Sequence, residues 1–288
     1  MSLRPVTIPR ICVAGMKRSL FLATALWFSS TVGALPLAAG ELATLGRQLF
    51  FDKRLSADDS LSCATCHRPD RAFTDGQAKS LGIAQRQGDY NAPTVLNRAK
   101  AKRHFWDGRA TSLEEQALGP LLNPKEMGNT REALEAKLNR MAAYRLRFAR
   151  AFPSPEVTLP RIARALAAYE KTLRSRRSLY DDYLRGRRQG WTADHELGRM
   201  IFTGPGGCSA CHNGQNFTND ALIADAEGKR WKVPSLRELV HTAPYFHDGR
   251  YGSLAEVVDA HGDTARLDPK SKRALVLFLE SLSGDYSR

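Results

Sequence analysis

Long hydrophobic runs and strand-like patterns are rare in this sequence of 288 residues. Beyond about the first forty residues, no stretch of about 18 apolar residues occurs, which excludes a bundle of membrane-spanning helices. Regular alternation of apolar and polar residues, which is typical of half-buried strands, is also scarce. Hydrophobic residues nevertheless make up 42% of the chain and charged residues 25%, so the sequence can form a packed, mainly helical core.

Acidic residues are too few to balance the basic ones, and the formal net charge is +13. An apolar run follows Lys17 and Arg18 and ends in small residues, which predicts a secretory signal peptide over residues 1–39. Cleavage is expected after Ala34 or Ala39, and an uncleaved membrane anchor is the alternative. Removal of this segment takes away four basic residues and no acidic one, which leaves +9. We therefore expect a soluble periplasmic protein whose partner is an acidic protein rather than a nucleic acid.

Cysteine is scarce as well, and its positions indicate the class of protein. One of the five cysteines lies in the predicted leader, and the other four form the motifs CATCH and CSACH. Cysteines of an exported protein normally pair as disulfides, but a histidine directly after C-x-x-C is the signature of covalent c-type haem attachment. A redox C-x-x-C pair and a zinc site are the alternatives. The motifs predict two haems, each held by two thiols and one histidine ligand: Cys63, Cys66 and His67, and Cys208, Cys211 and His212.

Three segments occur twice, in the same order around each C-x-x-C-H motif. LGRQLFF and LGRMIFT precede the motifs, and APTVLN and VPSLRE follow them. FWDGRATSLEEQ (105–116) then matches FHDGRYGSLAEV (246–257), with identical residues at seven of twelve positions. Such ordered self-similarity predicts an internal duplication in which each copy surrounds one haem.

The duplication and the helical patterns predict a mostly α fold with two cytochrome c-like haem domains, residues 40–185 and residues 186–288. Each Asp-Gly-Arg is expected to form a turn, with Ser112 and Ser253 near the N-cap of the following helix. SKRALVLFLESL near the end of the chain has an apolar stripe at helical spacing. PEVTLPRIARALAAYEKTL has another, which places four apolar residues on one face: Ile162, Leu166, Tyr169 and Leu173.

With these motifs the chain resembles the bacterial dihaem cytochrome c peroxidase and MauG family. The resemblance extends over residues 41–283 and rests on both C-x-x-C-H motifs together with NAPTVLN, FWDGR, EQALGPLLNPKEM and VPSLRELVHTAPYFHDG. It implies a peroxidatic haem in the N-terminal domain and an electron-transfer haem in the C-terminal domain. It also implies a calcium ion between the two domains.

The resemblance assigns roles to four residues that follow the first haem motif. Trp106 matches the tryptophan that lies between the haems, where an indole can relay electrons. Glu126 matches the acid above the peroxidatic iron, with Gln116 and Pro120 as its neighbours. A carboxylate within reach of both peroxide oxygens can move a proton from one to the other, as general base and then as general acid. From the sequence alone, core packing of Trp106 and a surface position for Glu126 are the alternatives.

The predicted calcium site depends entirely on the resemblance. Asn91, Thr242 and Pro244 match the calcium ligands of the family. A side-chain amide oxygen and backbone carbonyl oxygens, completed by water, are the hard donors that calcium prefers.

One departure from the family concerns the sixth ligand of the first haem. Classical members of the family close this haem with a histidine sixteen residues after the proximal one, and reduction of the second haem releases it. Ile83 occupies that position here, and no histidine occurs between His67 and His104. Because isoleucine cannot bind iron, we expect a first haem that is open without reductive activation, as in MauG-like members.

A second departure concerns the second haem. Where related peroxidases have methionine and MauG has tyrosine, this chain has His261, and no methionine follows the second motif. We expect His212 and His261 to bind the same iron, which lowers its potential relative to a Met/His pair. His247 is the rival ligand, and a surface position for His261 is the other alternative. Three further histidines are expected not to be ligands: His104, His195 and His241.

These features lead to three functional hypotheses. The first is an exported dihaem peroxidase that reduces hydrogen peroxide with electrons from a small cytochrome c or cupredoxin. The second is a MauG-like oxidase that uses peroxide to modify a partner protein or a small molecule. The third is a non-enzymatic electron carrier, against which Ile83 and Glu126 argue. Dimers are common in the family that the chain resembles, which makes a homodimer one possible state of this protein.

Overall fold

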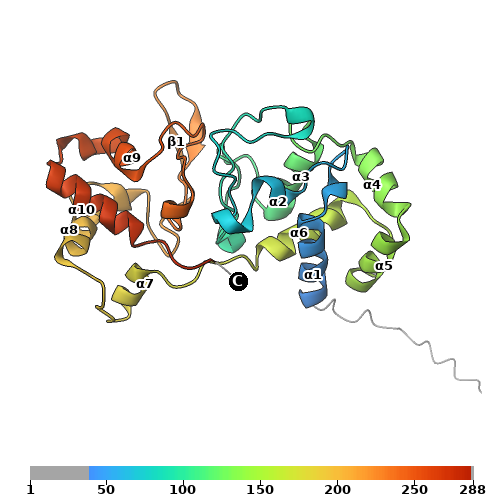
Figure 1. Cartoon of the computed structure of the whole chain (residues 1–288), viewed down its shortest axis with the longest axis horizontal. Helices are drawn as coiled ribbons and strands as arrows, with labels where there is room; N and C mark the ends of the chain where they lie inside the picture. The colour runs from blue at the N-terminus through green and yellow to red at the C-terminus, as the bar shows by residue number, and fades with distance from the viewer. Residues whose placement is uncertain (1–38, 287–288) are drawn as a thin grey trace, which may run out of the picture. The chain divides into compact units, whose positions relative to one another are not determined.

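The computed structural model describes residues 39–286, so residues 1–38 of the predicted signal peptide lie outside the described part (Figure 1). The described residues belong to one compact unit and are mainly helical, as predicted, with one two-stranded sheet. None of the described helices is long and apolar enough to cross a membrane. The α-helices and strands are α1 (Ala39–Phe50), α2 (Cys63–Cys66), α3 (Leu113–Leu122), α4 (Arg131–Asn139), α5 (Ala142–Ala151), α6 (Leu159–Glu170), α7 (Leu179–Leu184), α8 (Ala193–Thr203), β1 (Leu222–Ala224), β2 (Arg230–Lys232), α9 (Leu254–Ala260) and α10 (Pro269–Glu280).

The first hydrophobic core is built around the contact of α1 with α6, to which α3, α4 and α5 add their apolar faces. The two helices approach closely at Gly46, where a Cβ atom would collide with the carbonyl of Ala165. The predicted apolar face is confirmed within α6 for Ile162, Leu166 and Tyr169, which are buried. Leu173 is buried as well, but it lies beyond the end of the helix at Glu170.

The second core forms around α8 and α10, with α9 packed against α10. Gly198 of α8 again allows a close approach, because its Cβ atom would collide with the carbonyl of Ala274. The predicted C-terminal helix is present, but it begins at Pro269, two residues before the segment SKRALVLFLESL. Asp268 sets this start, since its carboxylate accepts hydrogen bonds from the first free backbone amides of the helix.

The two Asp-Gly-Arg segments form turns of the same kind, as predicted. Gly108 has a φ of +69° and Gly249 a φ of +66°, in the left-handed region that glycine tolerates. Ser112 caps α3 by accepting from the Glu115 amide, and Ser253 caps α9 by accepting from the Glu256 amide. The N-cap prediction is therefore confirmed at both serines.

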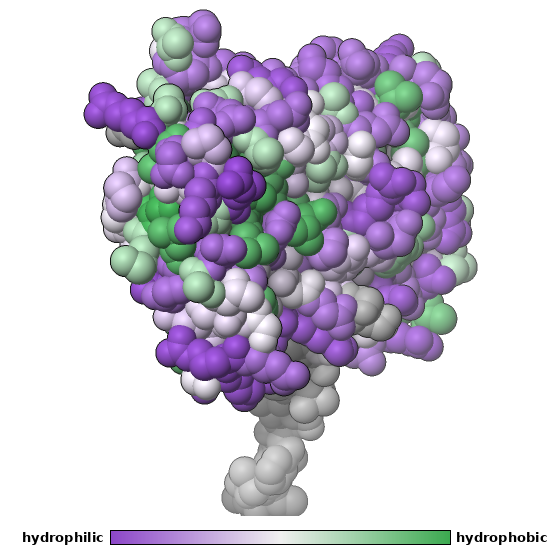
Figure 2. All heavy atoms as spheres, turned by 60° about the vertical axis from the view of Figure 1, so that its left-hand side comes forward, coloured by the Kyte–Doolittle hydropathy of each residue, from purple (hydrophilic) through white to green (hydrophobic). Residues whose placement is uncertain are grey.

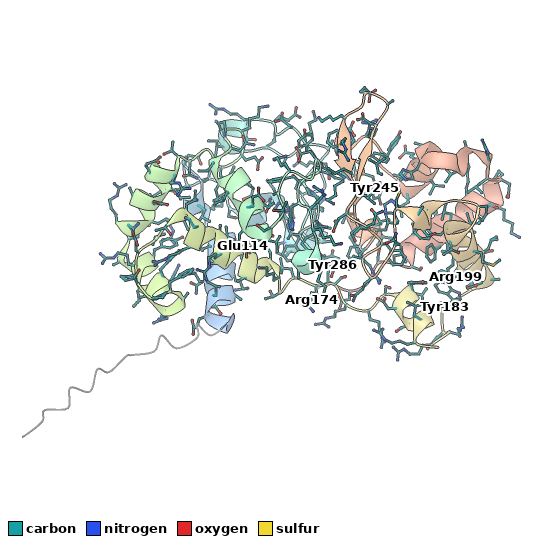
Figure 3. The ribbon with its side chains drawn as sticks, turned by 180° about the vertical axis from the view of Figure 1, so that it is seen from behind. Glu114, Arg174, Tyr183, Arg199, Tyr245 and Tyr286 are labelled. Carbon is teal, nitrogen blue, oxygen red and sulfur yellow. The ribbon has the colours of Figure 1, made fainter. Side chains whose placement is uncertain are left out.

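The segment between the two cores contains α7 and is fixed by polar contacts. Arg237 donates to both carboxylate oxygens of Asp181 on α7, at 3.1 and 2.9 Å. The ring of Tyr183 lies beside Arg199 of α8, as Figure 3 shows. At the end of the described chain, the hydroxyl of Tyr286 donates to the carbonyl of Asp70.

Candidate functional site

One cavity of about 950 Å³ receives every residue that the sequence analysis assigns to the site. All four cysteines and both histidines of the C-x-x-C-H motifs line it, as does His261. Its wall also includes Trp106, Gln116, Pro120 and Glu126, and the predicted calcium ligands Asn91, Thr242 and Pro244. Figure 2 shows one face of the molecule, where hydrophobic side chains gather around a hollow bordered by hydrophilic ones.

The first motif forms the short helix α2 and a turn that orients His67. The Nδ1 atom of His67 lies 3.1 Å from the carbonyl oxygen of Phe73, so this nitrogen is engaged and Nε2 remains for a ligand. Cys63 and Cys66 are free thiols rather than a disulfide. Burial raises the pKa of Cys63 to about 12 and that of Cys66 to about 11.

The second motif repeats this arrangement and adds a facing imidazole. The Nδ1 atom of His212 lies 3.1 Å from the carbonyl oxygen of Phe217. The ring centroids of His212 and His261 are 6.1 Å apart. Metal–imidazole bonds are about 2 Å long, so one metal ion between two imidazoles puts their centroids roughly 6 Å apart. The pair therefore fits a shared iron ligation. His247 does not face His212 in this way.

Glu126 is half-buried in the cavity wall. Its Oε1 atom accepts a hydrogen bond of 2.7 Å from the side-chain amide of Asn123. Burial raises the pKa of Glu126, although the Asn123 hydrogen bond opposes this shift. Glu126 also contributes to raising the pKa of both thiols of the first motif, so its carboxylate lies within electrostatic reach of them.

The loop that carries Ile83 packs against the Glu126 segment. The Ile83 amide donates to the Glu126 carbonyl at 2.9 Å, and the Ile83 side chain fills the space beside Gly128. Ile83 itself is not part of the cavity wall, although its neighbour Gly82 is.

Gln116 and Pro120 reach the cavity from α3. Pro120 lies inside this helix, and its carbonyl accepts from the Met127 amide at 3.2 Å. This bond helps to fold the chain after α3 back, so that the segment with Glu126 returns to the same cavity wall.

Trp106 connects elements that are far apart in the sequence. Its indole Nε1 donates to the Asn91 carbonyl at 2.9 Å, and its own carbonyl accepts from the Lys232 amide at 2.7 Å. The Asn91 amide in turn donates to the carbonyl of His247 at 2.8 Å. Asn91 is thus fixed next to the segment that contains Thr242 and Pro244.

Among the described residues, no group of three or more His, Cys, Asp or Glu side chains could hold a metal ion. The predicted calcium ligands are amide and carbonyl oxygens, so they do not belong to that class. They share the cavity wall, and the calcium site stays a prediction.

Several buried charges in the cavity wall were missed by the sequence analysis. Lys232 is 8% exposed, and burial lowers its pKa to about 7, with Arg98 adding to the effect. Burial raises the pKa of Glu170 to about 8, and its Oε2 atom has no hydrogen-bond partner. Arg98 directly follows the repeated segment APTVLN, and Lys232 directly precedes its counterpart VPSLRE. This adjacency is the only feature of the sequence that pointed to a place in the cavity wall. A haem carries carboxylate groups, and two enclosed cations suit them.

The remaining histidines differ in position. His104 lines the cavity and is buried, and burial lowers its pKa to about 4. The Nδ1 atom of His195 contacts the Thr192 hydroxyl at the start of α8. The ring of His241 packs on Tyr286. Neither His195 nor His241 lines the cavity.

The family model of the di-haem cytochrome c peroxidases matches residues 40–189. A cytochrome c551 peroxidase of Nitrosomonas europaea is 37% identical over 270 residues, which cover 85% of this chain and 80% of the relative. The methylamine utilization protein MauG of Methylorubrum extorquens is 34% identical, with 88% of this chain and 80% of the relative covered. The chain therefore belongs to the di-haem cytochrome c peroxidase family.

Solved structures agree with this assignment. A MauG-like protein associated with microbial copper homeostasis has a TM-score of 0.77 and 28% identity, with 86% of this chain and 91% of that chain covered. The diheme peroxidase BthA of Burkholderia thailandensis has a TM-score of 0.71 at 24% identity over 85% of this chain and 86% of that chain, a likeness of fold alone. The family implies two haems, and the relatives support peroxidase activity, as the sequence predicted.

Proposed function

We propose that the chain is an exported dihaem peroxidase that reduces hydrogen peroxide at its N-terminal haem. Cys63, Cys66 and His67 would hold that haem, and Cys208, Cys211 and His212 the second one, by covalent c-type attachment. A small cytochrome c or cupredoxin would supply electrons through the second haem and Trp106. The observation that carries this proposal is the convergence of all these side chains on one cavity.

When bound, the first haem supplies an iron with an open position and the electrons for cleavage of the peroxide O–O bond. The protein contributes proton transfer. Glu126 accepts a proton from one peroxide oxygen and returns it to the other, which then leaves as water. Its enclosure favours this task, because burial raises its pKa and brings its two protonation states closer in free energy. Gln116 and Pro120 shape the pocket beside it.

We attribute the proposed open position of the first haem to the loop that carries Ile83. Its amide is bonded to the Glu126 carbonyl, and its side chain packs at Gly128. Isoleucine has no atom that binds iron, so position 83 would leave the iron open, and the peroxidase would need no reductive activation.

His212 and His261 would both hold the iron of the second haem. The 6.1 Å separation of the rings supports this pairing. Two imidazoles give a lower potential than methionine with histidine, which makes the second haem a weaker acceptor for a high-potential donor.

That low potential favours one second candidate, a MauG-like oxidase that uses peroxide to modify a partner protein or a small molecule. Such an enzyme needs a second haem that stabilises an oxidised state rather than one that collects electrons. A non-enzymatic carrier is the weaker third candidate, because it has no use for Glu126.

The two halves support an origin by duplication. The glycines at the helix contacts, the Asp-Gly-Arg turns and the serine caps recur at matching places. We infer two haem domains with the boundaries that the sequence predicts, residues 40–185 and 186–288. A calcium ion at Asn91, Thr242 and Pro244, periplasmic location and a homodimer complete the proposal.

Low-temperature EPR of the fully oxidised, haem-loaded protein is the first test. One high-spin and one low-spin ferric signal are expected, together with peroxide turnover by a reduced small cytochrome c. Two low-spin signals would mean that another group closes the first haem, and the open-site argument would fail. Turnover of peroxide without oxidation of the cytochrome would favour the MauG-like alternative.

A further inference from the structure

Four aromatic rings form a continuous path along the cavity wall. The ring centroids of Trp106 and His247 are 6.5 Å apart. His247 stacks on Trp231 at 3.7 Å with an interplanar angle of 15°. Trp231 then meets Tyr90 edge-on at 5.7 Å. All four residues line the cavity, and each is partly exposed.

Trp231 lies between a carboxylate, which contacts its Nε1 atom, and an ammonium group, which lies over its ring. Both groups affect how readily the indole loses an electron. Trp231 belongs to β2, opposite Ile223 of β1 in the hairpin drawn in orange in Figure 1. Its indole Nε1 donates to a carboxylate oxygen of Asp225 at 2.6 Å. The ammonium of Lys229 lies 4.3 Å from its ring centroid and 3.2 Å from the hydroxyl oxygen of Tyr90.

These groups act on an oxidised indole in opposite ways. A cation over the ring disfavours positive charge there, so Lys229 makes the oxidised ring a stronger oxidant. Asp225 can take the Nε1 proton, so that the ring becomes neutral after electron loss. The ring of His247 contacts both Trp106 and Trp231. Because imidazole is harder to oxidise than indole, His247 connects the two indoles without itself being oxidised.

We propose that Trp231 is a second oxidation site, at which small electron-rich phenols give electrons to the indole. The electrons then pass through His247 to Trp106 without a protein donor. The proposal rests on the proposed function, because peroxide reduction supplies the oxidising power. A phenol ring can stack on the exposed part of the indole or pack beside Tyr90. Its hydroxyl can then accept a hydrogen bond from Lys229. A small phenol suits this place, because one ring and one hydroxyl match the exposed part of the indole and the ammonium of Lys229.

The reaction is balanced with one-electron steps. Trp231 passes one electron through His247 to Trp106, and its Nε1 proton moves to Asp225. A phenol then gives the neutral indole radical one electron and its hydroxyl proton and leaves as a phenoxyl radical, while Asp225 releases its proton to solvent, from which peroxide reduction takes one up. Two phenols supply the two electrons and two protons that convert one hydrogen peroxide into two water molecules.

The test compares Trp231→Phe with Trp191→Phe in the haem-loaded protein, using 2,6-dimethoxyphenol as the donor. Trp191 is a matched control, because its indole also contacts a carboxylate, that of Glu196, and a tyrosine ring, that of Tyr183, but it is outside the cavity wall. Phenylalanine keeps a stacked ring at position 231. We expect Trp231→Phe to lower kcat/KM for the phenol by about tenfold or more, and Trp191→Phe by less than about twofold.

A second measurement does not depend on turnover. Peroxide is added without any donor, and oxygen addition to tryptophan is located by mass spectrometry, with the radical recorded by EPR. The signal and the oxidation are expected at Trp231 and not at Trp191. Asp225→Asn, which keeps the shape but removes the proton acceptor, should weaken the neutral-radical signal.

Peroxide consumption with a reduced cytochrome c is recorded in the same preparations. If the cytochrome reaction proceeds while Trp231→Phe oxidises the phenol as fast as the unmodified protein, the second site is refuted and the proposed function stands. If Trp231→Phe slows only the cytochrome reaction, Trp231 serves a protein donor and the phenol proposal is wrong. If no preparation consumes peroxide, the proposed function itself fails.

Discussion

The surroundings of His67 and His212 are nearly alike on one side and different on the other. In both, Nδ1 lies 3.1 Å from a phenylalanine carbonyl oxygen that follows the motif. His261 lies opposite His212, whereas among the described residues no histidine ring accompanies His67 in this way. Glu126 instead lies within electrostatic reach of the thiols beside His67. The same local fold thus has a second imidazole beside one motif and a carboxylate beside the other, and the proposed function assigns a closed haem to the first case and an open haem to the second.

The largest effect is expected from removing the carboxylate of Glu126, which distinguishes the surroundings of His67 from those of His212. Glu126→Gln keeps the size of the side chain but cannot accept the peroxide proton. We expect kcat/KM for peroxide to fall by about 10²–10⁴-fold, the usual contribution of a general acid–base group. Stopped-flow reaction of the oxidised protein with peroxide measures this.

Glu132→Gln is the matched control for that experiment. Glu132 is an exposed acid in the first turn of α4 and does not line the cavity. Unchanged kinetics in Glu126→Gln would show that the cavity carboxylate does not move the proton.

A second prediction changes His261, the imidazole that lies opposite His212. His261→Met replaces one imidazole by the thioether that related peroxidases have, and the potential of the second haem should rise. The expected shift is on the order of 0.1 V, within the roughly 0.8 V that axial ligands span. Spectroelectrochemical titration measures it, with His241→Met as control, because His241 does not line the cavity. An unchanged potential would mean that His261 is not a ligand.

A smaller effect tests the likeness of the two halves. Gly46→Ala and Gly198→Ala each push a methyl group against a backbone carbonyl of the facing helix. Each should lower the free energy of unfolding by about 1–3 kcal/mol, because the helices must separate. Gly40→Ala is the control on α1, since nothing lies within 4 Å of its Cβ position. Thermal unfolding measures all three, and tolerance at only one of the two contacts would weaken the inferred equivalence of the halves.

Many helices, caps and turns of the fold could be predicted from the sequence. The apolar stripe of α6, the serine caps and the turns depend on local patterns, which are readable without tertiary contacts. The start of α10 at Pro269 was missed because Asp268 and Pro269 define it, while the apolar pattern begins later. The hairpin of β1 and β2 was missed because each strand has only three residues and little alternation.

The buried charges were beyond reach for another reason. Lys232 and Glu170 carry side chains that are usually exposed. Their burial results from elements that meet only in the folded chain, such as the contact of the Lys232 amide with the Trp106 carbonyl. The path of Trp231, His247 and Tyr90 likewise joins residues that have no spacing in common.

The smallest expected effect concerns the residue after each LGR segment. Asp52 follows the first, and Gly204 follows the second. Burial raises the pKa of Asp52, but hydrogen bonds from Arg54 at 2.8 Å and Tyr144 at 2.6 Å outweigh it and lower that pKa to about 2. A lowered pKa means that the unfolded chain binds the proton more tightly. The stabilising contribution is therefore present above about pH 4 and is lost as the pH falls towards 2.

Asp52→Asn should remove this pH-dependent contribution. We expect a loss on the order of 1–2 kcal/mol in the free energy of unfolding at pH 7, discounted for partial exposure of Arg54. Between pH 4 and 2 the variant should lose less stability than the unmodified protein, because it has no carboxylate to protonate there. Denaturant titrations across this range measure the difference. Parallel pH profiles for the two proteins would show that the charge of Asp52 does not contribute to stability. Position 52 would then resemble its counterpart Gly204, which has no charged side chain.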